Sequence, residues 1–324
     1  MKRYILVVGL FLSVFGLGIG VPVLHAQSYP QHPIQLVIPG APGDASDIAA
    51  RIMAEELAKI LKTPIVPINK PGGASTVGAD FVAKGKKDGY TILYGITSGL
   101  VYSPAFSPEE VPYNPLRDLE PLGLHVFFPD GISVQAESPW KSFPEVIDYA
   151  KKNPGKFRVG TLGVGSINHF RLEIIKSLTG TDITMIPFKG ASPALTALLG
   201  GHIEAAFVAY AMSYTHYESG KLRGILADQK VPALPDIPTL SQLGYKQDLP
   251  PTYFALLGPA GIPEEAKKVL IPAIEKAAKN PELNARLQKM WFIPNYKSPA
   301  ELKRLMSEDY ENAVAIVKKM GVTK

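Results

Sequence analysis

The stretch that decides the fold is IQLVIPGAPGDASD, residues 34–47. Its first part, Ile34–Ile38, is an apolar run typical of a β-strand, and the apolar positions of residues 48–61 recur at helix spacing. Two glycines and two prolines lie between them and predict an open turn. Ser46 or Asp47 is the expected N-cap of the helix. The free backbone N–H groups at such a helix start form a ready site for an anion.

Length and composition predict a globular protein with a substantial core. The chain has 324 residues, of which 46% are hydrophobic and 19% are charged, and this length is enough for two domains. The formal net charge is +5, and removing Lys2 and Arg3 leaves 32 basic against 29 acidic residues, or +3. That charge is too small and too evenly spread to favour a nucleic-acid partner.

The N-terminal segment has the pattern of a secretory signal peptide. Lys2 and Arg3 precede the apolar run Tyr4–Leu24, which ends before His25-Ala26-Gln27. We therefore expect residues 1–26 to be a signal peptide and the protein to be periplasmic. Leu24 is a poor match to the small residue preferred before a cleavage site, so an uncleaved membrane anchor stays open. The chain has no cysteine, which excludes disulfides and a lipid-anchored cysteine.

The strand, glycine-rich turn and helix pattern recurs along the chain. It is repeated after the predicted strands at residues 64–69 and 157–160, and a third strand at 91–95 ends in the small and hydroxyl-bearing residues 96–99. Strands alternating with helices predict parallel βαβ units. Ligands of such sheets bind at the carboxyl ends of the strands. The three turns are therefore expected to lie around one pocket.

We predict an α/β protein of two lobes, each a mostly parallel sheet flanked by helices. Lobe 1 is expected to be discontinuous, made of residues 27–123 and 252–324. Lobe 2 is expected to span residues 124–251, with crossings between the lobes near Gly123 and Thr252.

A series of motifs in sequence order resembles a known family. Any one of them is weak, but the ordered set runs from Tyr29 to the last predicted helix. The motifs are Pro39–Asp47, Asn69–Gly78, Asp88–Thr91, Pro112–Pro115, Gly163–His169, Lys189–Leu195 and Pro235–Thr239. Together they resemble the Bug or TctC-type extracytoplasmic solute receptors, the substrate-binding proteins of tripartite tricarboxylate transporters.

The resemblance implies a type II periplasmic-binding-protein fold in which two lobes close on one ligand. It implies a small organic acid (a dicarboxylate, a tricarboxylate or an aromatic carboxylate) held by backbone amides, hydroxyls and bridging waters. It further implies integral membrane transporter subunits as partners, a monomeric receptor, no cofactor, no metal and no catalysis.

The resemblance and the turn chemistry together give a set of expected ligand contacts. The turn at Pro39–Asp47 corresponds to the turn that receives one carboxylate in the family. The predicted contacts are Gly40, Ala41, Asp44, Ser46, Ser75, Thr97, Ser98, Thr161, Ser166, Asn168, His169 and Tyr210. For His169, a structural role beside a helix start is an equal alternative. Lys189 is either a counter-ion for a carboxylate or, as we favour, a solvated loop lysine.

Three departures from the family pattern bear on the ligand. Gly40 stands where an aromatic residue is usual, which removes bulk, and Tyr210 follows a segment that lacks the usual Phe-Asp-Asn and is expected to form an aromatic wall. Asp44 stands where glycine is usual and places an acidic group in the loop expected to receive an anion. Two like charges about 4 Å apart repel by roughly 4 kcal/mol at an effective dielectric near 20, about half of the roughly 8 kcal/mol that micromolar binding supplies. Asp44 therefore either faces solvent or meets a hydroxyl, an amide or an amine of the ligand.

Two other function classes compete with a transport receptor. A ligand sensor for a membrane signalling system would need the same closing cleft, so the sequence leaves it open. A periplasmic hydrolase is less favoured because the chain has no G-x-S-x-G motif and no histidine pairs at metal-binding spacing. The glycines at 163 and 165 lack the complete G-x-G-x-x-G spacing, which argues against a dinucleotide site.

Overall fold

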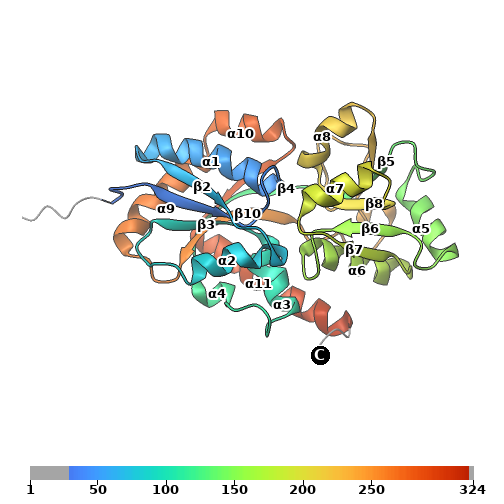
Figure 1. Cartoon of the computed structure of the whole chain (residues 1–324), viewed down its shortest axis with the longest axis horizontal. Coiled ribbons are helices and arrows are strands. Elements are labelled where there is room, and N and C mark those ends of the chain that lie inside the picture. Colours follow the sequence, from blue (N-terminus) through green and yellow to red (C-terminus); the bar gives the residue numbers. More distant parts are fainter. Residues whose placement is uncertain (1–28, 321–324) are drawn as a thin grey trace, which may run out of the picture.

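The computed structural model describes residues 29–320. Within that range the chain forms two β-sheets, each with its own helices, side by side along the long axis of the molecule (Figure 1). This confirms the predicted α/β, two-lobed fold class. The predicted signal peptide lies outside the described residues. No helix of residues 29–320 combines the length and the hydrophobicity needed to cross a bilayer.

The first sheet has six strands drawn from both ends of the described chain. In spatial order they are β11 (Ile293–Lys297), β4 (Leu119–Phe128), β10 (Thr252–Pro259), β3 (Thr91–Ile96), β1 (Ile34–Ile38) and β2 (Ile65–Asn69). Apart from the exposed Gln35, strand β1 is buried on both faces, as its otherwise apolar sequence predicts. Its alternate side chains enter two different cores, with Leu36 in one and Val37 in the other.

Helices cover both faces of this sheet. Helices α1 (Ala45–Leu61), α9 (Glu264–Ala278) and α10 (Pro281–Gln288) pack on the face that includes Leu36. The opposite face is covered by α2 (Thr76–Ala83) and the long helix α11 (Pro299–Met320). The short elements on this side are η1 (Gly73–Ser75), η2 (Ser98–Tyr102), α3 (Ser103–Phe106) and α4 (Pro115–Asp118).

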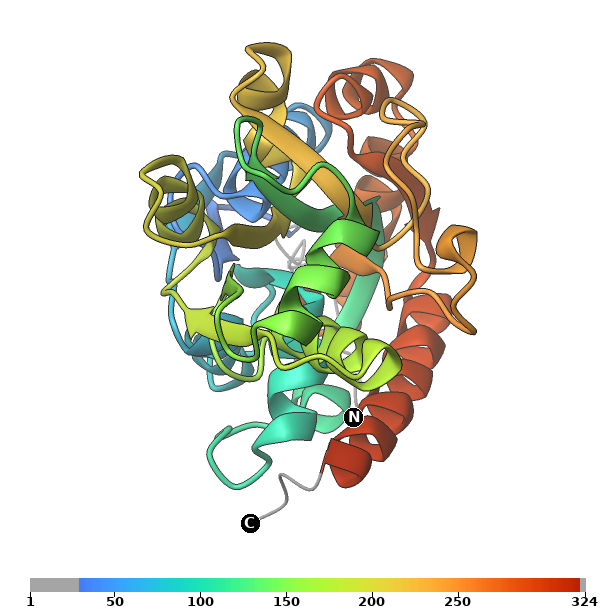
Figure 2. The same cartoon turned by 90° about the vertical axis from the view of Figure 1, so that its right-hand side faces the viewer.

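The second sheet has five strands and is also covered on both faces. In spatial order the strands are β7 (Thr184–Pro187), β6 (Arg158–Thr161), β8 (Ala205–Ala209), β5 (Asp130–Gln135) and β9 (Leu222–Ala227). Helices α5 (Phe143–Lys152) and α6 (Ile167–Thr179) pack on one face. Helix α7 (Ala191–Leu199) packs on the other face, and α8 (Tyr210–Glu218) follows β8. The long connection from β9 to β10 contains η3 (Ser241–Leu243). Figure 2 views the molecule from this side and shows α11 running along its edge.

The sheets are mixed rather than mostly parallel. Strand β1 pairs in parallel with β2 and β3, whereas β10 runs antiparallel to both β3 and β4. In the second sheet, β5 runs antiparallel to β8 and β9. The antiparallel strands β4, β5, β9 and β10 are those on either side of the two chain crossings between the sheets. The βαβ pattern of the sequence cannot predict them, because they are not joined through alternating helices.

The first crossing lies six residues beyond the predicted one. All of β4 belongs to the first sheet, and its last residue, Phe128, still pairs with Thr252 of β10. The chain passes to the second sheet at Pro129, since Asp130 already pairs with Ala209. The predicted lobe boundary after Gly123 therefore falls inside β4, where a glycine at a register shift resembles a break in sequence.

Candidate functional site

A cavity of about 290 Å³ lies between the two sheets. The first half contributes the turn between β1 and α1, the turn that contains η1, and the start of η2. The second half contributes residues 162–164 after β6 and residues 187–191 after β7. The turns that follow strands β1, β2, β3, β6 and β7 thus meet at one place, as expected for the carboxyl ends of strands in α/β sheets.

Asp47 shapes the turn between β1 and α1 from outside the cavity. Its carboxylate accepts hydrogen bonds from the backbone N–H of Gly43 (3.0 Å), Nε of Arg51 (2.9 Å) and Nδ2 of Asn69 (2.9 Å). Burial raises the pKa of Asp47, but these hydrogen bonds outweigh burial, so its pKa lies below the ordinary value. The predicted N-cap was wrong, because the helix begins at Ala45 and Asp44 occupies the cap position.

Asp44 lines the cavity and joins the two halves of the protein. Its Oδ2 accepts from the N–H of Ala41 (3.0 Å), and its Oδ1 accepts from the hydroxyl (2.6 Å) and the N–H (3.2 Å) of Ser192 in α7. Burial raises the pKa of Asp44, and the hydrogen bonds from Ser192 and Ala41 only partly offset this. The alternative that Asp44 faces solvent is therefore wrong, since the residue is 6% exposed.

Gly40 lies against the side chain of Ser46. A Cβ at position 40 would lie 2.0 Å from Oγ of Ser46. The Ser46 hydroxyl therefore occupies the position of a Cβ at residue 40, and a side chain there would require Ser46 to rotate; that Gly40 enlarges the pocket stays a prediction. Both residues line the cavity.

The turn at residues 72–75 presents backbone and a hydroxyl to the cavity. Ala74 and Ser75 have φ angles of 49° and 79°, in the left-handed region that few non-glycine residues adopt. A Cβ on Gly99 would lie 2.7 Å from the carbonyl oxygen of Ser75, so glycine is needed where this turn meets η2. Ser98, next to Gly99, accepts from the N–H of Ile167 in the second half (3.2 Å).

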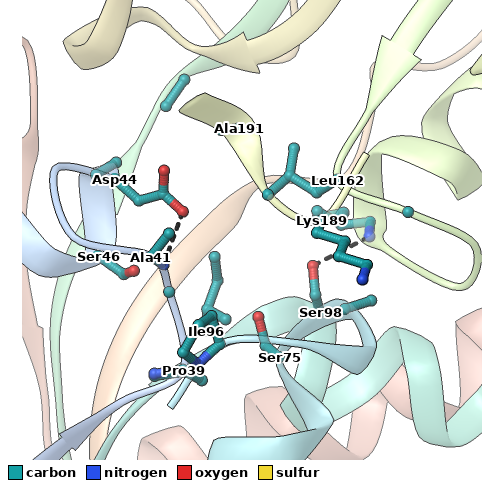
Figure 3. A pocket seen from close by; sticks show the side chains of 18 of the residues that line it. Pro39, Ala41, Asp44, Ser46, Ser75, Ile96, Ser98, Leu162, Lys189 and Ala191 are labelled. Carbon is teal, nitrogen blue, oxygen red and sulfur yellow. Dashed lines mark hydrogen bonds between the residues drawn. The ribbon is translucent and has the colours of Figure 1, made fainter. Parts of the chain in front are cut away.

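Lys189 is the one basic side chain among the described residues that line the cavity. It follows β7 and is exposed, and in Figure 3 its amine lies on the side of Ser75 and Ser98, opposite Asp44. The position therefore suits a counter-ion for an anion in the cavity. This is the interpretation that the sequence favoured less.

Most of the remaining cavity wall is apolar. Three aromatic rings contribute to it, those of Phe128, Phe188 and Phe254, together with Ile96 and Met212. Phe128 and Phe254 stack with ring centroids 4.1 Å apart and belong to the strands on either side of the crossings. A ligand of this cavity is therefore held by a few polar groups on an apolar surface, as in small-molecule sites generally.

Half of the predicted contact residues line the cavity. These are Gly40, Ala41, Asp44, Ser46, Ser75 and Ser98. The structure does not bring the other six to the cavity wall, and their polar atoms have partners within the protein. These six are Thr97, Thr161, Ser166, Asn168, His169 and Tyr210. For all twelve, ligand contact itself stays a prediction.

The hydroxyls of Thr97 and Ser166 and the ring of His169 serve backbone positions. Thr97 Oγ1 both accepts from and donates to the backbone of Tyr253 in β10. Ser166 is the N-cap of α6, accepting from the N–H of His169 and donating to Gly163. Nδ1 of His169 accepts from the N–H of Gly165, and burial lowers the pKa of this histidine.

The other three residues are also engaged within the second half. Thr161 accepts a long hydrogen bond from the N–H of Gly163 (3.4 Å), and Asn168 donates to the carbonyl of Phe207. Tyr210 is fully buried behind β5, where its hydroxyl donates to the carbonyl of Leu226 (2.7 Å). The expected aromatic wall is therefore formed by phenylalanines rather than by Tyr210.

A buried ionic cluster beside the cavity was not predicted from the sequence. Arg171 of α6 pairs with Asp130 and Asp228, and also donates to Thr252 Oγ1 (2.8 Å). Asp130 and Thr252 line the cavity and begin the strands that follow the two crossings. A single arginine in an amphipathic helix carries no sequence signal for such a role. Phe128 and Phe188, in contrast, end or follow a strand, where the rule that ligands bind at the carboxyl ends of strands could have found them.

No group of three or more His, Asp or Glu side chains in residues 29–320 is placed to hold a metal ion. The polar groups of the cavity are backbone N–H groups, hydroxyls, two carboxylates and one amine. Such a set binds and orients a small polar molecule.

Comparison with solved structures shows which class of protein has this fold. The structure of the periplasmic binding protein BugD superposes with a TM-score of 0.85 at 28% identity, covering 91% of this chain and 100% of BugD. A Rhodopseudomonas palustris protein solved with adipate, Rpa4515, gives 0.86 at 25% identity, covering 91% and 99%. MatC from the same species, solved with bound malate, gives 0.83 at 25% identity, covering 89% and 100%. The fold is thus that of a two-lobed periplasmic binding protein.

The family follows from the sequence comparisons. Residues 49–322 match the family model described as "Tripartite tricarboxylate transporter family receptor". BugT of Bordetella pertussis is 29% identical over 323 residues, covering 99% of this chain and 98% of BugT. The chain belongs to the tripartite tricarboxylate transporter receptor (TctC) family, which confirms the resemblance found in the sequence.

Proposed function

We propose that this protein is a periplasmic solute receptor that captures a small organic carboxylate between its lobes and delivers it to the membrane subunits of a tripartite tricarboxylate-type transporter. The observation that carries the proposal is the interlobe cavity, where strand-end turns, Ser75, Ser98 and the amine of Lys189 converge. Hydroxyls, backbone N–H groups and an ammonium are the groups that stabilise a carboxylate. Two structurally similar proteins were solved with the carboxylates adipate and malate, which supports this ligand class.

Binding without chemistry is the natural use of this site. Among the described residues, the cavity lining contains serines but no histidine, so it lacks the Ser–His pair that most serine hydrolases use. Incubation of the purified protein with carboxylate esters and amides is expected to return them unchanged. Turnover of any of them would favour the hydrolase alternative.

The proposal is tested by a melting-temperature screen followed by calorimetric titration. The screen compares mono-, di- and tricarboxylates, aromatic acids and amino acids with neutral sugars as the control class. A ligand at 100 times its Kd adds about 2.7 kcal/mol of stability, which shifts the melting point by several degrees. Stabilisation by carboxylates but not by sugars is expected, and a protein that no carboxylate stabilises would contradict the proposal.

The delivery step needs a test in cells. Deleting the chromosomal copy is expected to abolish uptake of the radiolabelled ligand while leaving the transcriptional response to that ligand intact. The opposite result, normal uptake with a lost response, would support the sensor alternative.

A further inference from the structure

The charged groups of the cavity are unevenly balanced. Among the described residues, its lining has two carboxylates, Asp44 and Asp130, and one amine, that of Lys189. Asp130 pairs with the fully buried Arg171, which also pairs with Asp228. Within residues 29–320, no lysine or arginine forms an ion pair with Asp44. Asp44 is thus the acidic group of the cavity that lacks a basic partner in this part of the chain.

The Asp44 carboxylate is held in place and still has room for a donor. It accepts three hydrogen bonds, one from Ala41 and two from Ser192. An ionised carboxylate offers about four lone-pair sites. Figure 3 shows its oxygens on the cavity side of the β1–α1 turn, with the dashed bond to Ala41 below them. One acceptor position therefore remains for a group that enters the cavity.

The opposite end of the cavity has the reverse character. In the view of Figure 3, the amine of Lys189 and the hydroxyls of Ser75 and Ser98 lie on the side of the picture away from the Asp44 carboxylate. Their amine and hydroxyls can donate to an anion. The rest of the lining includes Ile96 and aromatic rings, which offer no hydrogen-bond donor or cation to a carboxylate.

We infer that the ligand is an acid with a single carboxylate, bound beside Lys189, and with a hydrogen-bond donor at its far end, a hydroxyl or an ammonium, which Asp44 accepts. This inference rests on the proposed function and narrows its ligand class. A second carboxylate at the far end would meet a buried like charge and find no cation there, and like charges at contact distance in a partly buried site repel strongly. Asp44 is accordingly a specificity-determining residue.

The ranking of chemically matched acids tests the inference in the unmodified protein. Calorimetric titrations use adipate, 6-hydroxyhexanoate, 6-aminohexanoate and hexanoate, and a four-carbon set of succinate, 4-hydroxybutanoate, 4-aminobutanoate and butanoate. Within the length that fits, a donor-bearing acid is expected to bind at least tenfold more tightly than both the dicarboxylate and the unsubstituted acid. The hydroxy and amino arms then identify which donor is used.

Two variants separate the ends of the cavity. Asp44→Asn is expected to weaken the amino acid at least tenfold and to strengthen the dicarboxylate, because the repelling charge is gone. Lys189→Met is expected to weaken all acids of one length by a similar factor and to keep their order. Glu55→Gln is the control, since it removes one negative charge from the exposed face of the same helix, α1, outside the cavity lining, and it should leave the order unchanged.

The outcomes distinguish the inference from the proposed function. If the dicarboxylate or the unsubstituted acid binds the wild-type protein as tightly as the donor-bearing acids, the inference is wrong while the receptor function stands. If Asp44→Asn folds and preserves the wild-type ranking, Asp44 does not set it and the inference is equally wrong. If no acid of either set, and none in the wider screen, binds at all, the proposed function itself fails.

Discussion

The guanidinium of Arg171 and the carboxylate of Asp228 form an ion pair in which neither side chain has any exposed surface. Nη2 of Arg171 lies 2.5 Å from Oδ2 of Asp228, and the same guanidinium bonds to Asp130 and Thr252. Arg171 belongs to α6, whereas Asp130 and Thr252 begin the strands after the two crossings. One side chain therefore joins a helix of the second half to both connections between the halves.

Replacing Arg171 with Met is expected to destabilise the protein by about 3–5 kcal/mol. The substitution leaves two buried carboxylates without their cation, and breaking a buried pair by removing one partner costs about that much. Burial already raises the pKa of Asp228 well above its ordinary value, although Arg171 opposes this. Urea unfolding at neutral pH measures the change, and a loss below about 1 kcal/mol would contradict a structural role for the cluster.

Ser98 and Ser166 are expected to respond differently to replacement by alanine. Ser98 lines the cavity, so Ser98→Ala should weaken ligand binding by about 1 kcal/mol, the typical worth of one hydrogen bond. Ser166 caps α6, so Ser166→Ala should lower the free energy of unfolding by about 1 kcal/mol. Calorimetric titration of both variants measures the change in binding free energy, and urea unfolding measures the change in the free energy of unfolding. Ser166→Ala weakening the affinity while leaving stability unchanged would restore the direct ligand contact that the sequence predicts for this residue.

The sequence predicted the local elements because their causes are local. The apolar run of β1, the glycine-rich turn after it and the apolar face of α1 each appear within a few residues. The rule that ligands bind at the carboxyl ends of strands then placed Ala41, Ser75 and Ser98 correctly around one cavity. Each of these features is determined by residues that are close together in the sequence.

The features that the sequence did not predict depend on partners far along the chain. Asp44 meets Ser192, which lies 148 positions away, and Thr97 bonds to Tyr253, 156 positions away. A hydroxyl after a strand gives the same sequence signal whether it faces a ligand or the backbone of a strand from the other end of the chain. Thr97 and Ser98 are adjacent, yet only Ser98 reaches the cavity.

Replacing Gly78 with Ala is expected to destabilise the protein although Gly78 lies inside α2. Helix propensity alone would favour alanine by up to about 1 kcal/mol. A Cβ at this position would, however, lie 2.9 Å from Cβ and 3.0 Å from Cα of Pro39, in the turn that begins the cavity wall. Such overpacking costs about 1–3 kcal/mol, so a net loss is expected in urea unfolding. A gain in stability would show that the turn moves aside freely.

Asp309 on α11 is expected to make the stability of the protein depend on pH between about 4 and 6. Burial raises the pKa of Asp309 from 3.8 to about 6. The folded protein therefore holds this proton more tightly than the unfolded chain. The resulting stabilisation is complete below about pH 4 and is lost as the pH rises through about 6, a loss on the order of 2–3 kcal/mol.

Asp309→Asn cannot titrate, so its stability minus that of the wild type should increase by that amount between pH 4 and pH 7. Urea unfolding of both proteins across this range measures the difference, in which the other titrating groups cancel. A constant difference would show that Asp309 has an ordinary pKa in the folded state.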